Sequence, residues 1–251
     1  MKRSIFPILA AAAVFAVAPL PSCQSGSPKD IRDYYLPLKQ LEDGLVYEYR
    51  PVAIDSLTPI YWFYRSYLRE DGIYLTGTYY EHDLIPRQIV REELVSNGML
   101  VEDVFLYEAR ADSSGLQDRT EVDVLQGAAF PFEVTDSNGV FLYQLQWSPP
   151  QDSGAVITLT KNRRYLKDTV VAVLGENLDA VVFSVQELLE YDQNGVFEQQ
   201  YAGREVYAKG LGLVYYDKQI GPGMELSYAL HRRYPMEVLE EQFEQKINHE
   251  H

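Results

Sequence analysis

The chain lacks the local sequence signatures that most enzyme classes carry. Its 251 residues contain one cysteine, Cys23, and four histidines. There is no Gly-x-Ser-x-Gly, no His-Glu-x-x-His and no Walker loop, the patterns that position a nucleophile, a zinc ion or a nucleotide. Acidic residues are numerous enough to supply a glycosidase-like pair, but nothing in the sequence singles one out. We therefore expect no enzymatic activity, no catalytic residue and no cofactor.

Basic residues and metal-ligand patterns are also scarce. Lysine and arginine number 22 against 37 acidic residues, so the formal net charge is −15 at pH 7. Such a surface repels nucleic acids, and we expect no nucleic-acid partner. The run His249-Glu250-His251 stands at the end of the sequence, where no second layer of side chains would orient metal ligands. No metal site is therefore expected.

Long hydrophobic runs are missing except near the N-terminus. Residues 1–22 begin with Lys2 and Arg3 and continue with an almost uncharged apolar stretch, Ile5 to Ala18. The stretch is shorter than an ordinary membrane span, which is typical of a secretory signal peptide. The sequence after it has no apolar run of spanning length. We therefore predict that residues 34–251 form a single β-rich domain.

The end of the apolar stretch, Leu20-Pro21-Ser22-Cys23, resembles a bacterial lipobox. The resemblance implies cleavage before Cys23 and its acylation, so that the chain contacts the membrane through an N-terminal lipid and residues 23–33 form a tether. The alternative is ordinary secretion with cleavage near Ala18. That alternative leaves a reactive lone thiol in an exported protein, so the sequence favours a lipoprotein.

The tether predicts which membrane the lipid enters. No acidic run follows Cys23, and in Bacteroidota such a run resembles a signal for surface export. Gln24 also differs from the aspartate that, by resemblance to the enterobacterial sorting rule, retains a lipoprotein in the inner membrane. We therefore predict an outer-membrane lipoprotein that faces the periplasm.

Tyrosine, in contrast, is abundant. Twenty tyrosines accompany ten phenylalanines and two tryptophans, and tyrosine favours strands with one buried and one solvent-exposed face. Apolar and polar residues alternate in segments such as 45–50, and turns such as Asp71-Gly72 and Ser96-Asn97-Gly98 recur about every 8 to 15 residues. The pattern predicts a mainly β fold: an antiparallel meander that forms a curved sheet, half-barrel or sandwich.

Four segments of the C-terminal half need separate predictions. Residues 155–160 and 169–174 are expected to form two strands. Residues 180–191 are rich in β-branched and aromatic residues, which favours a strand over a helix. From Pro235 onward the period changes, with Met236, Leu239, Phe243 and Ile247 on one helical face. We predict a short C-terminal helix that covers one face of the sheet.

Two motifs resemble those of uncharacterised small lipoproteins of Bacteroidota. Tyr34-Tyr35-Leu36-Pro37-Leu38-Lys39 is similar to their Y-F-P-L-K opening, and residues 207–214 are similar to their Y-A-K-G-V-G-L-V hairpin. The resemblance implies an antiparallel sheet curved around an apolar concavity, loosely similar in shape to the LolA and LolB carriers. It implies no activity. On physical grounds, the two glycines of Lys209-Gly210-Leu211-Gly212 are expected to mark a bulge or a sharp bend.

Two functions remain open at this stage. In the first, the protein is a lipid-anchored envelope binding protein that holds a lipid or another hydrophobic ligand in the curved sheet. Phe141, Tyr143 and Trp147, which share one face of a strand, are the candidate ligand-binding face. In the second, the protein is an interaction or scaffold subunit of an envelope assembly, binding a protein or glycan through exposed tyrosines.

Two short segments resemble the O-glycosylation pattern of Bacteroidota, which is Asp, then Ser or Thr, then an apolar residue. They are Asp55-Ser56-Leu57 and Asp168-Thr169-Val170. The resemblance implies that Ser56 and Thr169 are modified.

Overall fold

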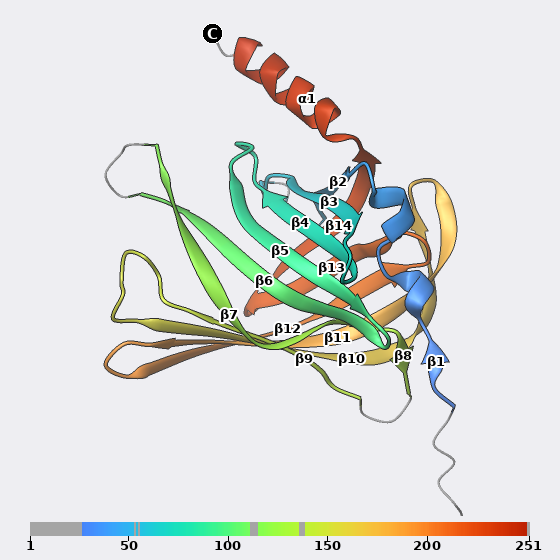
Figure 1. Ribbon diagram of the computed structural model, residues 1–251, viewed down its shortest axis with the longest axis horizontal. Coiled ribbons are helices and arrows are strands. Elements are labelled where there is room, and N and C mark those ends of the chain that lie inside the picture. The colour runs from blue at the N-terminus through green and yellow to red at the C-terminus, as the bar shows by residue number, and fades with distance from the viewer. Residues whose placement is uncertain (1–26, 53, 55, 111–114, 136–138, 250–251) are drawn as a thin grey trace, which may run out of the picture.

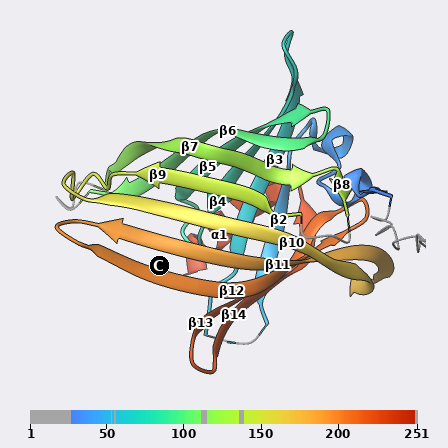
Figure 2. The ribbon, with the colours of Figure 1, turned by 90° about the horizontal axis from the view of Figure 1, so that it is seen from below.

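A computed structural model shows a closed antiparallel barrel followed by a C-terminal helix (Figures 1 and 2). It describes residues 27–52, 54, 56–110, 115–135 and 139–249. Within these residues, twelve strands form the barrel in chain order, which are β2 (Leu45–Pro51), β3 (Ile60–Leu68), β4 (Ile73–Tyr80), β5 (Pro86–Val95), β6 (Gly98–Ala109), β7 (Gln117–Pro131), β9 (Phe141–Trp147), β10 (Val156–Val173), β11 (Glu176–Asp192), β12 (Val196–Ala208), β13 (Gly212–Gly221) and β14 (Met224–Tyr234).

The predicted antiparallel meander and C-terminal helix are confirmed. Each barrel strand pairs with the next one along the chain, and β14 pairs with β2, which closes the ring. Register shifts interrupt several ladders, for example between Arg91 and Glu92 and between Val206 and Tyr207. Bulges of this kind add to the natural twist of strands and bend a sheet, so the predicted curved sheet curls far enough to meet itself.

Individual strand predictions have mixed outcomes. The β3–β4 and β5–β6 hairpins turn at Asp71-Gly72 and Ser96-Asn97, as predicted. Residues 180–191 lie within β11, which confirms a strand over a helix. The two strands expected at 155–160 and 169–174 are wrong, because one continuous strand, β10, spans the region with a bulge between Tyr165 and Lys167.

The N-terminal segment fills one end of the barrel. A short strand, β1 (Lys29–Asp30), pairs with β8 (Glu133–Val134), and two 3-10 helices follow, η1 (Arg32–Tyr34) and η2 (Leu38–Leu41). The buried side chains of this segment, Ile31, Tyr35 and Leu41, belong to the main hydrophobic core. The segment lies beside β8 in Figure 1. We call residues 31–41 the plug.

The plug packs against the hairpin between β12 and β13. The Gly210 N–H donates to the Asp33 carbonyl at 2.8 Å, and a Cβ on Gly212 would lie 2.8 Å from Cδ2 of Leu36. Both glycines have positive φ, +75° at Gly210 and +88° at Gly212, which side chains resist. Gly210 and Gly212, expected to mark a bulge or a sharp bend, therefore form a tight turn beside a bulge. The contact also joins the two motifs that resemble Bacteroidota lipoproteins, residues 34–39 and residues 207–214.

The C-terminal helix α1 (Met236–His249) covers the outside of the barrel only with its first turns. Leu239 is fully buried, and Phe243 meets the Tyr61 ring edge-on at 5.9 Å between ring centroids. In Figure 1 the rest of the helix continues away from the strands. The helix is predicted to cover one face of the sheet, but it covers only the part of β2 and β3 that lies beneath Leu239.

A buried glutamate stabilises the closing seam between β14 and β2. Glu48 is 1% exposed and accepts hydrogen bonds from Arg50 Nε at 2.8 Å, Arg232 Nε at 2.6 Å and the Tyr234 hydroxyl at 2.9 Å. Arg232 also donates to Gln242 of α1 at 2.9 Å. Burial alone would raise the pKa of Glu48, but these donors outweigh burial and lower it.

We expect Glu48→Gln to lower the free energy of unfolding by about 2–3 kcal/mol, because it removes a buried charge that three donors satisfy. The matched control is Glu102→Gln, since Glu102 pairs with Arg91 across a more exposed ladder. That change should lower stability by less than about 1 kcal/mol. Urea unfolding measures both variants. Equal losses would show that the seam does not depend on Glu48.

Candidate ligand-binding cavity

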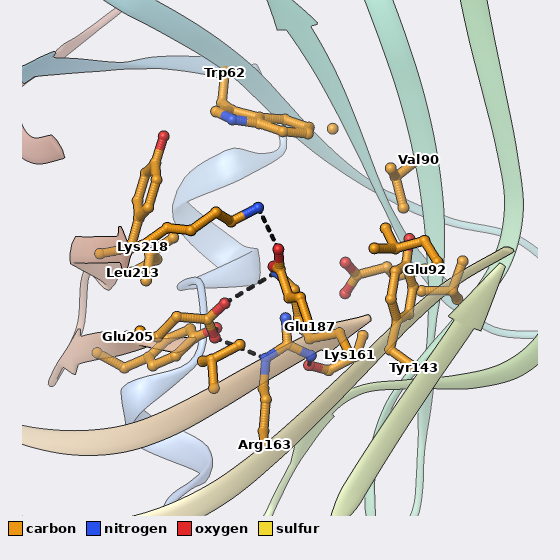
Figure 3. A pocket seen from close by; sticks show the side chains of 18 of the residues that line it. Trp62, Val90, Glu92, Tyr143, Lys161, Arg163, Glu187, Glu205, Leu213 and Lys218 are labelled. Carbon is orange, nitrogen blue, oxygen red and sulfur yellow. Dashed lines mark hydrogen bonds and ion pairs between the residues drawn. The ribbon is translucent and has the colours of Figure 1, made fainter. Parts of the chain in front are cut away.

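A cavity of about 430 Å³ lies inside the barrel (Figure 3). Its volume is within the range that small-molecule pockets occupy. Alternate residues of each strand point inward. The residues of β10 to β13 that line the cavity are Leu159, Lys161, Arg163, Val185, Glu187, Tyr201, Ala202, Gly203, Glu205, Tyr207, Leu213, Tyr216, Asp217 and Lys218. The opposite strands, β3, β4 and β5, supply mainly aromatic and apolar residues.

The aromatic wall consists of two stacked rings on β3. Trp62 and Tyr64 lie 5.7 Å apart between ring centroids, with 5° between their planes. A Cβ on Gly77 of β4 would lie 2.9 Å from the Tyr64 ring and 3.3 Å from the Trp62 ring. Glycine at this position therefore lets both rings lie flat over the neighbouring strand, with Trp62 facing the cavity in Figure 3.

Opposite charges alternate along the other wall. Lys218 pairs with Glu187. Lys161 lies 2.9 Å from a Glu187 oxygen and 3.3 Å from a Glu205 oxygen. Arg163 Nε donates to Glu205 at 2.7 Å. These five residues, which we call the charge row, cross four adjacent strands, and Figure 3 shows them meeting in the cavity.

The charge row is internally compensated. Burial alone would raise the pKa of Glu205, but Arg163 and Lys161 outweigh burial and lower it to about 2. Lys161 and Lys218 act on Glu187 in the same way and lower its pKa. Removing a carboxylate of the row leaves buried cations with fewer partners or none, which is the costly situation for ion pairs inside a protein.

Glu92 is the carboxylate on the other side of the cavity. It lies on β5, across the ring from β11 and β12, and its carboxylate points into the cavity in Figure 3. The hydroxyl of Tyr35, from the plug, donates to it. Among the residues that the structure describes, no cation forms an ion pair with Glu92. Burial therefore raises its pKa, although Tyr35 and the more distant Arg163 act in the opposite direction.

The three residues of the predicted ligand face have different surroundings. Tyr143 lines the cavity. Phe141 packs against the Phe183 ring at 6.4 Å between centroids, within the main core. Trp147 packs against a smaller apolar cluster that includes Val104. The face exists on β9 as predicted, but only its middle part borders the cavity, and ligand contact stays a prediction.

Sequence analysis missed the charge row, Glu92, Trp62 and Tyr64. A signal for the row was present in residues 159–165, where Lys161 and Arg163 occupy the same alternate positions as Leu159 and Tyr165. Charged residues at the inward-facing positions of a strand indicate that the interior of the barrel is polar.

The predicted modification sites lie elsewhere. Cys23 and Asp55 are outside the described residues. Ser56 is exposed in the connection between β2 and β3. Thr169 is half-buried on β10 and borders an outer groove, while its neighbour Asp168 pairs with Lys29. Lipidation and glycosylation therefore stay predictions.

Two further observations concern membranes and metals. The part of the chain that the structure describes has no helix with both the length and the apolar composition to cross a membrane. In the same residues, no three histidine, cysteine, aspartate or glutamate side chains gather as metal ligands would.

The chain is similar in fold to solved structures. A protein from Bacteroides fragilis, described as an exported protein with a YmcC-like fold, has a TM-score of 0.52 and 12% identity to this chain. The likeness covers 80% of this chain and 98% of that one. The chain has a YmcC-like fold. A lipoprotein of Parabacteroides distasonis (TM-score 0.48, 12% identity, 80% and 98% covered) and the hypothetical lipoprotein YmcC of Escherichia coli (0.32, 11%, 80% and 90%) are also similar. No family model and no curated protein sequence matches the chain.

The predicted resemblance to Bacteroidota lipoproteins is thus confirmed as a likeness of fold. At 12% identity the YmcC-like fold carries no substrate, ligand or partner to this chain. Function therefore has to be argued from the cavity and its residues.

We expect the YmcC-like barrel to lose stability as the pH falls from about 4.5, the ordinary value for glutamate, toward 2. In this range the unfolded chain takes up a proton at Glu205 that the folded chain does not, so folding becomes less favourable. Glu205→Gln should lower the free energy of unfolding by about 3–5 kcal/mol at pH 7. It should also reduce, by roughly 2–3 kcal/mol, the further decrease in that free energy between pH 7 and pH 2.5.

The control for this prediction is Glu121→Gln, because Glu121 is an exposed glutamate on β7 and the change in charge is the same. Urea unfolding between pH 7 and pH 2.5 measures the wild type and both variants. A Glu205→Gln protein as acid-sensitive as the wild type would contradict the role of the charge row.

Proposed function

We propose that this protein is a lipid-anchored binding protein of the cell envelope that holds an amphipathic small molecule in its barrel. The cavity of about 430 Å³ carries the proposal. One wall offers the stacked Trp62 and Tyr64 rings and the other offers charged groups. An apolar pocket with a few placed polar groups is the usual form of a small-molecule site.

The envelope location rests on the N-terminal sequence. The signal-like residues 1–22 and the lipobox-like sequence before Cys23 support it. The likeness in fold to a protein of Bacteroides fragilis described as exported agrees with it. We further propose that the lipid enters the outer membrane and that the barrel faces the periplasm, because no acidic run follows Cys23.

The charge row favours binding over catalysis. A general acid or base exchanges protons with its substrate and works best with a pKa near the operating pH. Glu187 and Glu205 are each held by two cations, and their pKa values are lowered. Such carboxylates are suited to shaping a wall and orienting a ligand.

An outer groove favours the alternative function as an interaction or scaffold subunit. It has a volume of about 570 Å³ and lies between the β10–β11 hairpin and strands β12 to β14. Val52, Leu166 and Val170 on its border are each more than half exposed. Exposed apolar groups are common at contact surfaces, so this groove is where a protein or glycan partner would bind.

The first test is native mass spectrometry of residues 24–251 after export to a bacterial periplasm, with organic extraction of anything bound. A co-purifying small molecule at defined stoichiometry would support the binding function. An apo mass together with no uptake of a hydrophobic fluorescent probe would contradict it, and a search for protein partners at the outer groove would follow.

A bulky substitution in the cavity should block binding. We expect Leu159→Trp to weaken probe uptake at least about tenfold, because the indole occupies space that Leu159 borders. The control, Val156→Trp, lies on β10 outside the cavity lining and is 38% exposed. It should change affinity less than about twofold. Fluorescence titration measures both variants, and equal effects would place the probe outside the barrel.

A further inference from the structure

Glu92 differs from every other charged residue of the cavity lining. Each of the others forms an ion pair, including Asp217, which pairs with Arg204. Glu92 has the Tyr35 hydroxyl as its hydrogen-bond donor, and no cation contacts it in the part of the chain that the structure describes. The cavity therefore contains one carboxylate whose charge the protein leaves unpaired.

Aromatic residues share the cavity with this carboxylate. Tyr35, Tyr64 and Tyr143 line the cavity with it, and the Trp62 ring faces the same space. Ring faces attract cations, and the attraction is strongest where water is excluded. An unpaired carboxylate in an aromatic-lined cavity is thus a site for a positively charged group.

The opposite wall is less suited to a free ion of either sign. Lys161 and Lys218 already contact Glu187, and Arg163 already contacts Glu205. An anionic ligand would have to compete with these carboxylates. A cationic group at Glu92 displaces no existing pair, and it gains a charge-assisted hydrogen bond.

We propose that Glu92 binds a protonated amine, and that the ligand of this cavity is an amphiphile with an amine at its polar end. This inference rests on the proposed function and names the chemistry of its ligand. The ammonium donates to the Glu92 carboxylate between the aromatic rings, and the apolar part of the ligand packs along Val90, Leu145 and Trp62. Burial raises the pKa of Glu92 in the empty protein, and a bound ammonium lowers it again.

The test compares three probes with the same alkyl chain: n-decylamine, n-decanol and n-decanoate. Because Trp62 and Trp147 are the two tryptophans of the chain, a Trp147→Phe background leaves Trp62 as the fluorescent reporter inside the cavity. At pH 7 the amine is protonated, as lysine is. We expect n-decylamine to bind about 10- to 100-fold more tightly than n-decanol, and n-decanoate to bind least.

Two substitutions on β5 supply the variant and its control. Glu92→Gln removes the charge but keeps an oxygen that can accept from Tyr35, and it should abolish the preference for the amine over the alcohol. Glu93→Gln makes the same change in charge at the next residue, which is not part of the cavity lining, and should keep the preference. Thermal unfolding checks that both variants are folded. The ranking of the three probes on the protein with Glu92 intact tests the preference for the amine, and the Glu92→Gln protein tests whether Glu92 is its source.

The outcomes separate this inference from the proposed function. Uptake of all three probes with equal affinity, or a preference for the amine that survives in Glu92→Gln, would overturn the amine site while the binding function stands. No uptake of any probe would overturn both.

A further experiment distinguishes an amine in a lipid headgroup from a free amphiphilic amine. The protein is incubated with vesicles of phosphatidylethanolamine or, separately, of phosphatidylglycerol, and native mass spectrometry then identifies any bound lipid. Capture of phosphatidylethanolamine alone would support an amine in a lipid headgroup. Uptake of n-decylamine with no lipid captured would support a free amphiphilic amine. Preferential capture of phosphatidylglycerol would overturn the proposal.

Discussion

The charge row from Lys218 to Arg163 is the interaction on which the cavity depends. Its carboxylates are at most 8% exposed, and a buried carboxylate is tolerated only where cations and donors surround it. The row crosses β10, β11, β12 and β13, so each strand supplies a charge that its neighbours need. A slip of one residue in any ladder would turn a charge to the outer face and leave its partners buried alone. The row therefore specifies register in the same strands that form the polar wall.

The plug connects the β12–β13 turn to the site. It contacts the β12–β13 turn through Asp33 and Leu36, and its Tyr35 reaches the cavity, where the hydroxyl meets Glu92. The two motifs that look unrelated in the sequence are thus halves of one contact. Because Tyr35 and Leu36 of the plug line the cavity, displacement of residues 31–41 would alter the site directly. The absence of a side chain at Gly212 leaves room for Leu36.

The sequence predicts the local structure well and the closure and cavity poorly, for one physical reason. Alternation and turn residues are local signals, and they identify the hairpins, the strand at residues 180–191 and the helix after Pro235. Closure depends on the pairing of β14 with β2, which are far apart in the chain. The alternation of apolar and polar residues within each strand does not indicate which distant strand it pairs with. The rule that inward residues are apolar also fails in β10, where Lys161 and Arg163 point into a polar lumen. Because of these inward charges, β10 is predicted as two separate strands, and the charge row is not recognised.

Glu92 is the place where the structure departs from what stability alone would favour. Glutamine at this position would accept the same hydrogen bond from Tyr35 with no buried charge, yet the chain carries a carboxylate whose pKa burial raises. A raised pKa means that ionised Glu92 opposes folding, and the opposition grows as the pH rises through that pKa. A ligand that compensates the charge binds the folded state alone and stabilises it more as the concentration of free ligand rises. Local conflicts of this kind concentrate at functional sites. The unpaired carboxylate therefore identifies the ligand-facing part of the cavity more sharply than the size of the cavity does.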